Sequence, residues 1–287
     1  MKKIMSILLT LTMLATTALA AAEEINVISR EDGSGTRGAF IELFGIEQKN
    51  AEGKKIDYTT DDCDITNSTS VMMTSVAGND CAIGYISLGS MNDTVKALKI
   101  DGVEASVENI KNGTYKVARP FNIATKAEVS DAAADFIAFI MSAEGQAVIE
   151  ENGYIAVVED APAFAGGKLS SKIICGKIVI AGSSSVTPVM EKLAEAYEAI
   201  NPGVEIELQQ SDSSSGMTST IDGVCGIGMA SRALKDSEIE KGLTGLTIAM
   251  DGIAVIVSLD NPVNGLTSEQ VRDIYMGEIT DWSEVNE

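Results

Sequence analysis

Histidine is absent from the 287-residue chain, and only four cysteines and one tryptophan occur in it. The chain therefore lacks the commonest general base, the commonest zinc ligand and every histidine-containing catalytic triad. Basic residues are also scarce: 21 Lys and Arg stand against 42 Asp and Glu, a net charge of −21. Nucleic acids and anionic membranes attract basic surfaces. We therefore expect neither of them as a partner, and no metal or cofactor.

The first twenty residues have the three-part pattern of a cleavable signal peptide. Lys2 and Lys3 form the basic region, Ile4–Leu14 is mostly apolar, and Ala18–Ala20 is an A-x-A cleavage site. The alternative, a buried N-terminal helix, fits this pattern less well. The apolar stretch is too short to span a bilayer, and no later stretch has the required length. We expect an exported, periplasmic protein, whose charge becomes −23 when the two lysines are removed.

The four cysteines are Cys63, Cys81, Cys175 and Cys225. Export permits disulfides, and four cysteines allow three pairings that sequence cannot distinguish. Cys63 and Cys81 are the least remote pair. No C-x-x-C occurs, so we expect structural bridges or buried thiols rather than a zinc or redox site.

Two α/β segments are joined by a linker. The first runs from about residue 24 to 158, and the second begins near residue 178. The linker, residues 159–172, is rich in Pro, Ala, Gly and Ser, which is typical of an exposed, flexible connection. Apolar strands such as Ile253–Val257 alternate with helical patterns. This alternation predicts mixed, mostly parallel sheets with helices on their faces.

Capping residues mark the expected helix starts. Ser130 and Ser142 are placed to cap two helices, and Thr187, which precedes a proline, to cap a third. Residues 267–270 form a capping box of the type T-x-x-Q at the start of a fourth helix. The third helix is expected to bury one face that includes Ile200.

Three turns combine glycine with small hydroxyl residues between an apolar strand and an apolar helix. They span Gly182–Ser185, Ser211–Gly216 and Gly33–Gly38. N–H groups at a helix N-terminus are unpaired and carry partial positive charge, glycine lets a ligand approach, and Ser and Thr add short donors. One such turn could be simple capping. Three together predict a cradle for a tetrahedral oxyanion.

The third turn also matches G-x-G-x-x-G, the pattern of dinucleotide-binding turns. That pattern requires its first glycine directly after the strand, whereas the polar run Ser29–Asp32 lies between them here. An exported protein also rarely meets NAD. Anion binding is therefore the better interpretation.

Charged residues flank these turns. Arg30 is expected to pair with the bound anion, with Asp32 holding its guanidinium; a solvated ion pair is the alternative. Arg232 either points into the same cleft or is solvated. Asp251 would accept a hydrogen bond from a ligand that carries a proton, as phosphate does near neutral pH and sulfate does not. The alternative is an ordinary turn aspartate before glycine.

Several stretches together resemble the phosphate-binding proteins of bacterial phosphate ABC transporters, which have the type II periplasmic-binding fold. The matching stretches include SREDGSGTRGAF, IVIAGSSSVTPVMEKLAEAY, QQSDSSSGMTSTIDG, IGMASRALKD and IAMDGIAVIVSLDNPVNGLTSEQVRDIYMGEITDW. They cover nearly all of the chain after the signal peptide, and REDGSGT is the most specific. The resemblance implies an α/β fold of two lobes that close on phosphate.

The resemblance also implies which residues bind phosphate. They are Ser184 and Ser185 in the first turn, Ser214 in the second, and Arg30, Ser34, Gly35 and Thr36 in the third, with Asp32 orienting Arg30. Some family members have a proton-accepting aspartate where this chain has Arg232. Asp251 is the candidate replacement for that aspartate, and Arg232 could add a positive contact.

The order of the two halves differs from that of the family, which normally begins with the GSSSV turn and ends near EGQAVIEENGY. The chain is therefore expected to be circularly permuted, with the linker joining the usual ends. Lobe I would comprise residues 116–246, including the linker 159–172, and lobe II residues 25–115 and 247–287. A fragment of a longer tandem array would give the same order.

The leading functional hypothesis is a monomeric periplasmic receptor that captures inorganic phosphate and docks on the permease subunits of an ABC transporter. A phosphate or oxyanion sensor or scavenger uncoupled from transport is the alternative. A phosphate-ester hydrolase is disfavoured, because the sequence has no histidine, no G-x-S-x-G motif and no clustered metal ligands.

Overall fold

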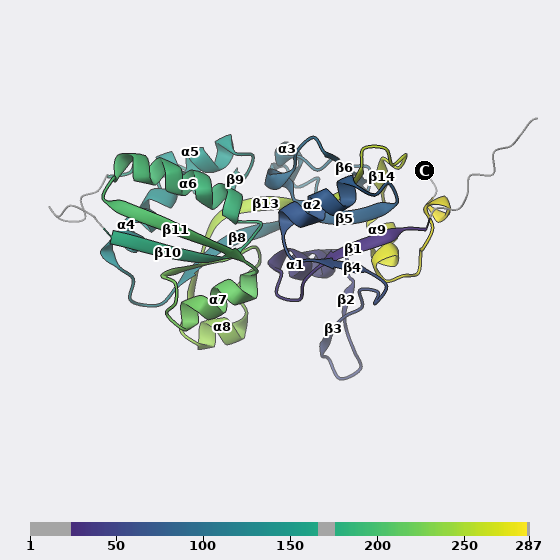
Figure 1. The fold of residues 1–287 in the computed structure, drawn as a ribbon, viewed down its shortest axis with the longest axis horizontal. Helices are drawn as coiled ribbons and strands as arrows, with labels where there is room; N and C mark the ends of the chain where they lie inside the picture. The colour runs from purple at the N-terminus through teal and green to yellow at the C-terminus, as the bar shows by residue number, and fades with distance from the viewer. Residues whose placement is uncertain (1–23, 166–175, 286–287) are drawn as a thin grey trace, which may run out of the picture.

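Two lobes lie side by side in the computed structural model and are joined by two long strands (Figure 1). The structure describes residues 24–165 and 176–285. The expected signal peptide, residues 1–20, lies outside these ranges. The expected α/β fold of two lobes is confirmed, with a ten-stranded sheet that continues from one lobe into the other.

Lobe I has a mixed sheet with helices on both faces, in which β8 is antiparallel to its neighbours β12 and β13. Its strands run in the order β11-β10-β12-β8-β13, and β10 is parallel to both β11 and β12. The elements are β8 (Ala118–Thr125), α4 (Asp131–Ile140), α5 (Ala143–Glu151), β9 (Ile155–Ala156), β10 (Gly176–Ser183), α6 (Thr187–Ile200), β11 (Val204–Ser211), α7 (Ser213–Ile221), β12 (Ile227–Ala230) and α8 (Asp236–Glu240).

Lobe II repeats this plan with the order β13-β5-β1-β4, in which β1 is parallel to β4 and β5. Its elements are β1 (Asn26–Arg30), α1 (Gly35–Leu43), β2 (Glu47–Lys49), β3 (Lys55–Asp57), β4 (Asp64–Thr66), α2 (Thr69–Ala77), β5 (Ala82–Ser87), η1 (Leu88–Ser90), β6 (Val95–Ala97), β7 (Lys99–Ile100), α3 (Val107–Lys111), β14 (Gly265–Leu266), α9 (Ser268–Tyr275) and η2 (Trp282–Glu284). Parallel pairing is thus confined to each lobe.

The connection between the lobes is β8 with the 15-residue strand β13 (Thr244–Ser258). Residues 244–252 of β13 pair antiparallel with β8, and residues 253–257 pair antiparallel with β5. On this strand the apolar core of lobe I ends at Ala249 and that of lobe II begins at Ile253. The expected lobe boundary at residues 246 and 247 lies just before this point. We propose residues 250–252 as the crossing.

The helix starts agree with the capping pattern at three of four positions. The side chains of Ser130, Ser142 and Thr267 each accept a hydrogen bond from a backbone N–H in the first turn. The prediction for Thr187 is wrong: it is the first helical residue of α6, and its hydroxyl donates to the Ser183 carbonyl, 3.1 Å away. Ile200 is 55% exposed, because it lies at the end of α6, beyond the buried face.

The first part of the expected linker, residues 159–165, is mostly exposed, as expected, but Phe164 packs on lobe I. The Phe164 ring lies edge-on to Phe139, with centroids 5.3 Å apart, and its backbone N–H donates to Glu144 at 2.7 Å. An aromatic ring among small residues therefore attaches this segment to lobe I. The later part, residues 166–175, lies outside the described residues.

The least remote cysteine pair, Cys63 and Cys81, forms no bridge, because Cys63 is a free thiol. Cys225 is a buried free thiol, one of the two outcomes expected for the cysteines. Cys175 lies outside the described residues. In the described ranges no single helix is long and apolar enough to cross a bilayer; α4 and α5, bent by 61° where they meet, have that length and composition only together.

The first described strand and the last elements of the chain are neighbours. Glu24 forms an isolated antiparallel bridge with Asp281, and the Ile25 N–H donates to the Thr280 carbonyl at 2.8 Å. In a family member with the usual order of halves, the chain would run directly from the stretch around Asp281 into the stretch around Ile25. The proximity supports circular permutation, which remains a prediction.

Candidate functional site

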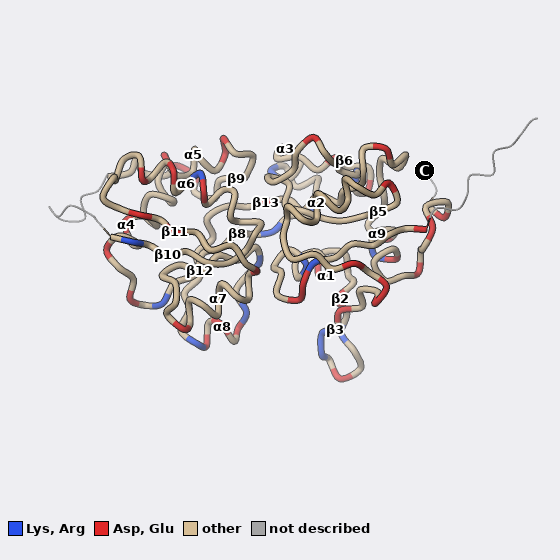
Figure 2. Tube along the Cα trace, viewed as in Figure 1, with Lys and Arg blue, Asp and Glu red and all other residues tan. Residues whose placement is uncertain are grey.

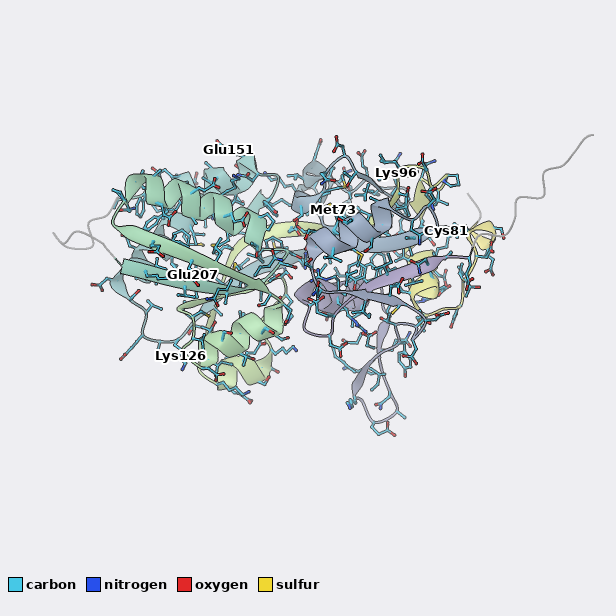
Figure 3. All side chains as sticks on the ribbon, in the orientation of Figure 1. Met73, Cys81, Lys96, Lys126, Glu151 and Glu207 are labelled. Atoms are coloured by element: carbon cyan, nitrogen blue, oxygen red, sulfur yellow. The ribbon has the colours of Figure 1, made fainter. Side chains whose placement is uncertain are left out.

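The three glycine- and hydroxyl-rich turns meet between the lobes. The carboxyl ends of β10, β11 and β12 in lobe I face those of β1 and β4 in lobe II, and α1, α2, α6 and α7 begin there (Figure 1). Ligands of open α/β sheets bind outside the carboxyl ends of their strands. Figure 3 draws the described side chains on the same ribbon, with Glu207 labelled on β11 of lobe I and Met73 on α2 of lobe II.

Hydroxyl groups from opposite lobes are in direct contact at this junction. The Thr36 and Ser185 hydroxyls are 2.7 Å apart, although 149 residues separate them in sequence. Thr36 is 1% exposed, Ser185 1% and Ser184 4%. The turns thus assemble a small, buried group of donors, as their composition predicts.

The second turn touches the third through its backbone. The Ser214 N–H and hydroxyl donate to the Gly33 carbonyl at 3.2 and 3.3 Å. Ser34 caps α1, because its hydroxyl accepts from the Arg37 N–H at 3.3 Å. Gly35 is the first residue of α1 and faces lobe I directly. The remaining backbone N–H groups at these helix starts can donate to a ligand.

The buried guanidinium of Arg30 reaches the first turn. Its Nη2 donates to the Ser184 hydroxyl at 3.1 Å. The carboxylate that orients it is Glu31, which accepts from Nε and Nη2, both at 2.8 Å. Asp32, the expected partner, is 99% exposed and pairs with Arg37 at 3.1 Å. The bidentate pair is therefore present, but with the neighbouring residue.

Arg232 lies beside the second turn. Its Nη2 donates to the Ser214 hydroxyl at 3.3 Å, and its guanidinium pairs with Glu238 at 2.7 Å. Burial raises the pKa of Glu238, but the hydrogen bonds from Arg232 and from the Lys235 N–H outweigh it and leave the pKa lowered. Arg232 is therefore held next to Ser214 with its charge balanced.

Asp251 does not contact the hydroxyl groups. It lies on β13 at 1% exposure, where its carboxylate pairs with Arg119 at 3.3 Å and accepts from the Gly89 N–H at 3.2 Å. Burial raises the pKa of this carboxyl, and Arg119 only partly offsets the effect. Asp251 thus lies behind Arg119 and is not placed to receive a proton from an anion among the turns.

Sequence reasoning missed several residues at the junction. The hydroxyl of Thr69, at the start of α2, lies 3.2 Å from that of Ser185 and 3.4 Å from that of Ser184. The segment Asn67-Ser68-Thr69 between β4 and α2 is a fourth hydroxyl-rich strand-to-helix turn and could have been recognised. The others are Ser213, Ser231, Glu31 and Arg119.

Gly35 allows the close approach of the lobes. A Cβ atom at this position would lie 2.4 Å from the Ser213 hydroxyl and 2.7 Å from that of Ser231, both in lobe I. These distances are far below van der Waals contact. A side chain here would hold the start of α1 away from lobe I.

We expect Gly35→Ala to weaken phosphate binding by at least about tenfold, because closing around the ligand would require repacking that costs more than about 1.4 kcal/mol. Gly38→Ala is the matched control in the same helix, since its Cβ would meet nothing closer than 4.0 Å. Isothermal titration of both variants tests this. Equal affinities for the two variants would contradict it.

The junction suits an oxyanion better than a metal ion. Within the described residues, no group of three or more His, Cys, Asp or Glu is placed to hold a metal ion. The side chains that meet there are mainly hydroxyls and arginine guanidinium groups, which donate hydrogen bonds to an anion.

Comparison with known proteins agrees with this geometry. The family model described as a PBP superfamily domain matches residues 9–144 and 165–287. Phosphate-binding protein PstS 2 of Streptococcus agalactiae is 56% identical over 263 residues, covering 91% of this chain and 88% of that protein. PstS 2 of Streptococcus pneumoniae is 44% identical, covering 93% and 89%.

A solved structure gives the same result. The crystal structure of a phosphate-binding protein of a phosphate ABC transporter from Streptococcus pneumoniae matches with a TM-score of 0.70 and 43% identity, covering 92% of this chain and all of that one. The chain therefore belongs to the PBP superfamily and, within it, to the family of PstS phosphate-binding proteins.

Proposed function

We propose that this chain binds inorganic phosphate between its two lobes, outside the cytoplasmic membrane, and supplies it to the permease of an ABC importer. The observation that carries the proposal is the meeting of buried hydroxyls from both lobes with the Arg30 guanidinium. The names of the PstS relatives support phosphate as the ligand. The similar solved protein from Streptococcus pneumoniae belongs to a phosphate ABC transporter, which supports coupling to such a transporter.

The short-range donors must overcome an unfavourable overall charge. Acidic residues are spread over both lobes (Figure 2), and the net charge of −21 repels an anion at long range. Solvent and salt screen most of that field, whereas hydrogen bonds to a buried anion are strong. Affinity should therefore come from the turns and Arg30.

A phosphate held by both lobes would complete the site. Thr36 belongs to lobe II and Ser185 to lobe I, so a phosphate bound to both would bridge the lobes. In the complex its oxygens would replace the contacts that these hydroxyls now make with each other. The two crossing strands, β8 and β13, would carry the hinge. The closed form would then dock on the permease as a monomer.

The alternative, a sensor or scavenger, is less favoured because the solved protein that is 43% identical to this chain is part of an ABC transporter. We also propose that binding occurs without catalysis. The chain has no histidine, and the carboxylates of Glu31, Glu238 and Asp251 are each engaged by an arginine.

Isothermal titration of the purified chain with inorganic phosphate tests the proposed function. We expect saturable binding of one phosphate per chain, with chloride at the same ionic strength as the control. The absence of saturable phosphate binding by a folded protein would refute the proposal.

A further inference from the structure

Arg119 is a second buried arginine next to the proposed phosphate site, and it lies on a crossing strand. It is 2% exposed on β8, and its register partner on β13 is Asp251. Its Nη1 donates to the Thr36 hydroxyl at 2.7 Å and to the Ser231 carbonyl at 3.0 Å, and its Nη2 pairs with Asp251 at 3.3 Å. One guanidinium thus contacts lobe II, lobe I and the hinge.

The contact with Thr36 fixes the direction of a hydrogen bond. A guanidinium can only donate, so the Thr36 oxygen must accept from Arg119. The single hydroxyl hydrogen of Thr36 must then point toward a different acceptor; the Ser185 oxygen lies 2.7 Å away here, and a phosphate oxygen would take this place in the complex. Arg119 therefore makes Thr36 a donor toward the anion.

Arg30 acts on the first turn in the same way. Its Nη2 donates to the Ser184 hydroxyl, which must then direct its own hydrogen elsewhere. Two buried arginines thus orient two hydroxyls, Ser184 and Thr36, one from each lobe. This arrangement prepares donors before the ligand arrives, which reduces the cost of ordering them on binding.

Stability alone is a weak explanation of the Arg119–Asp251 pair. Burial lowers the pKa of Arg119 to about 10 and raises that of Asp251, so both groups are unfavourably placed as charges. The Arg119 Nε is buried and has no hydrogen-bond partner among the described residues. Buried ion pairs are often no more stabilising than apolar side chains of the same volume.

We propose that Arg119, held by Asp251, is a positioning residue of the phosphate site that orients the Thr36 hydroxyl toward the anion in the closed arrangement. This inference rests on the proposed function. Its distinguishing consequence is that Arg119 influences phosphate through Thr36, whereas a purely structural hinge pair would act independently of the Thr36 hydroxyl.

A double-mutant cycle tests this consequence by isothermal titration with inorganic phosphate. The pair Arg119→Gln/Asp251→Asn removes both charges together and so leaves no unpaired buried ion. We expect it to weaken phosphate binding by at least about tenfold in the presence of Thr36, but by less than about threefold when Thr36→Val is already present.

Arg272→Gln provides the matched control, because Arg272 lies on α9 in ion pairs with Glu269 and Asp273, away from the turns, and should leave the affinity unchanged. Arg119→Lys keeps the charge and a single donor group in place of the guanidinium fork, so we expect partial recovery of the affinity. The inference would be overturned if Arg119→Gln/Asp251→Asn lost the same phosphate affinity with and without the Thr36 hydroxyl. It would also be overturned if this double variant bound phosphate with wild-type affinity. If wild-type protein does not bind phosphate, the proposed function itself fails, which is a different outcome.

If the variant Arg119→Gln/Asp251→Asn does not fold, the phosphate affinity of Arg119→Lys is measured instead, once with Thr36 present and once with Thr36→Val. A lysine cannot reach Thr36, Ser231 and Asp251 with one fork, so a loss that depends on the Thr36 hydroxyl remains the expected result. A loss independent of Thr36 again overturns the inference. Thermal unfolding of each variant verifies that the titrated protein is folded.

Discussion

Replacing Arg30 by glutamine is expected to weaken phosphate binding by at least about a hundredfold. Arg30 is 2% exposed and is the buried cation that contacts the first turn directly, through the Ser184 hydroxyl. Truncating one partner of a buried, hydrogen-bonded charge pair costs about 2–5 kcal/mol, and each 1.4 kcal/mol is about tenfold in affinity. Isothermal titration with phosphate measures the loss.

The interpretation depends on the carboxylate that Arg30 leaves behind. Glu31 accepts two hydrogen bonds from the guanidinium, so Arg30→Gln/Glu31→Gln, which removes both charges, should bind phosphate as weakly as Arg30→Gln. Recovery of wild-type affinity in this double variant would show that the unpaired Glu31 charge, rather than the lost cation, causes the effect. Arg272→Gln is again the control for a change of net charge.

Removing the hydroxyls of Thr36 and Ser185 together should have an effect at least as large. Each is expected to donate to phosphate from a different lobe, and a hydrogen bond to a charged group contributes about 1.5–3 kcal/mol. The double variant Thr36→Ala/Ser185→Ala should therefore lose about 3 kcal/mol or more, which is over a hundredfold in affinity.

Isothermal titration with phosphate of this double variant and of the control Thr244→Ala/Ser283→Ala tests this expectation. Thr244 and Ser283 provide the control because they are exposed hydroxyl residues away from the turns. Thr36→Ala alone and Ser185→Ala alone should each lose less phosphate affinity than the double variant. A double variant that binds phosphate within a few-fold of the control would place the anion elsewhere in the molecule.

The turns could be recognised from sequence because their geometry is local. In each case an apolar strand is followed within a few residues by glycine, serine or threonine and then by a helix, so the donors at the helix start are specified by neighbours in the chain. The parallel pairing of the strands then brings their carboxyl ends to one edge.

The arginine contacts could not be derived in this way. Arg119 lies 83 residues from Thr36 and 132 from Asp251, and only the pairing of β8 with β13 brings Arg119 and Asp251 together. The choice of Glu31 over Asp32 depends on which side of the chain each carboxylate faces after β1, which the spacing alone does not determine. The position of Asp251 just before an apolar run does not reveal its partner, because that partner comes from another strand.

The undivided strand β13 has a consequence for how the protein melts. Most linkers let neighbouring units denature separately. Here the single strand β13 forms backbone hydrogen bonds in both halves of the molecule, with β8 in one half and with β5 in the other. Denaturing either half would leave its stretch of β13 unpaired directly beside the stretch that the other half uses. The two halves are therefore expected to lose structure in a single cooperative transition.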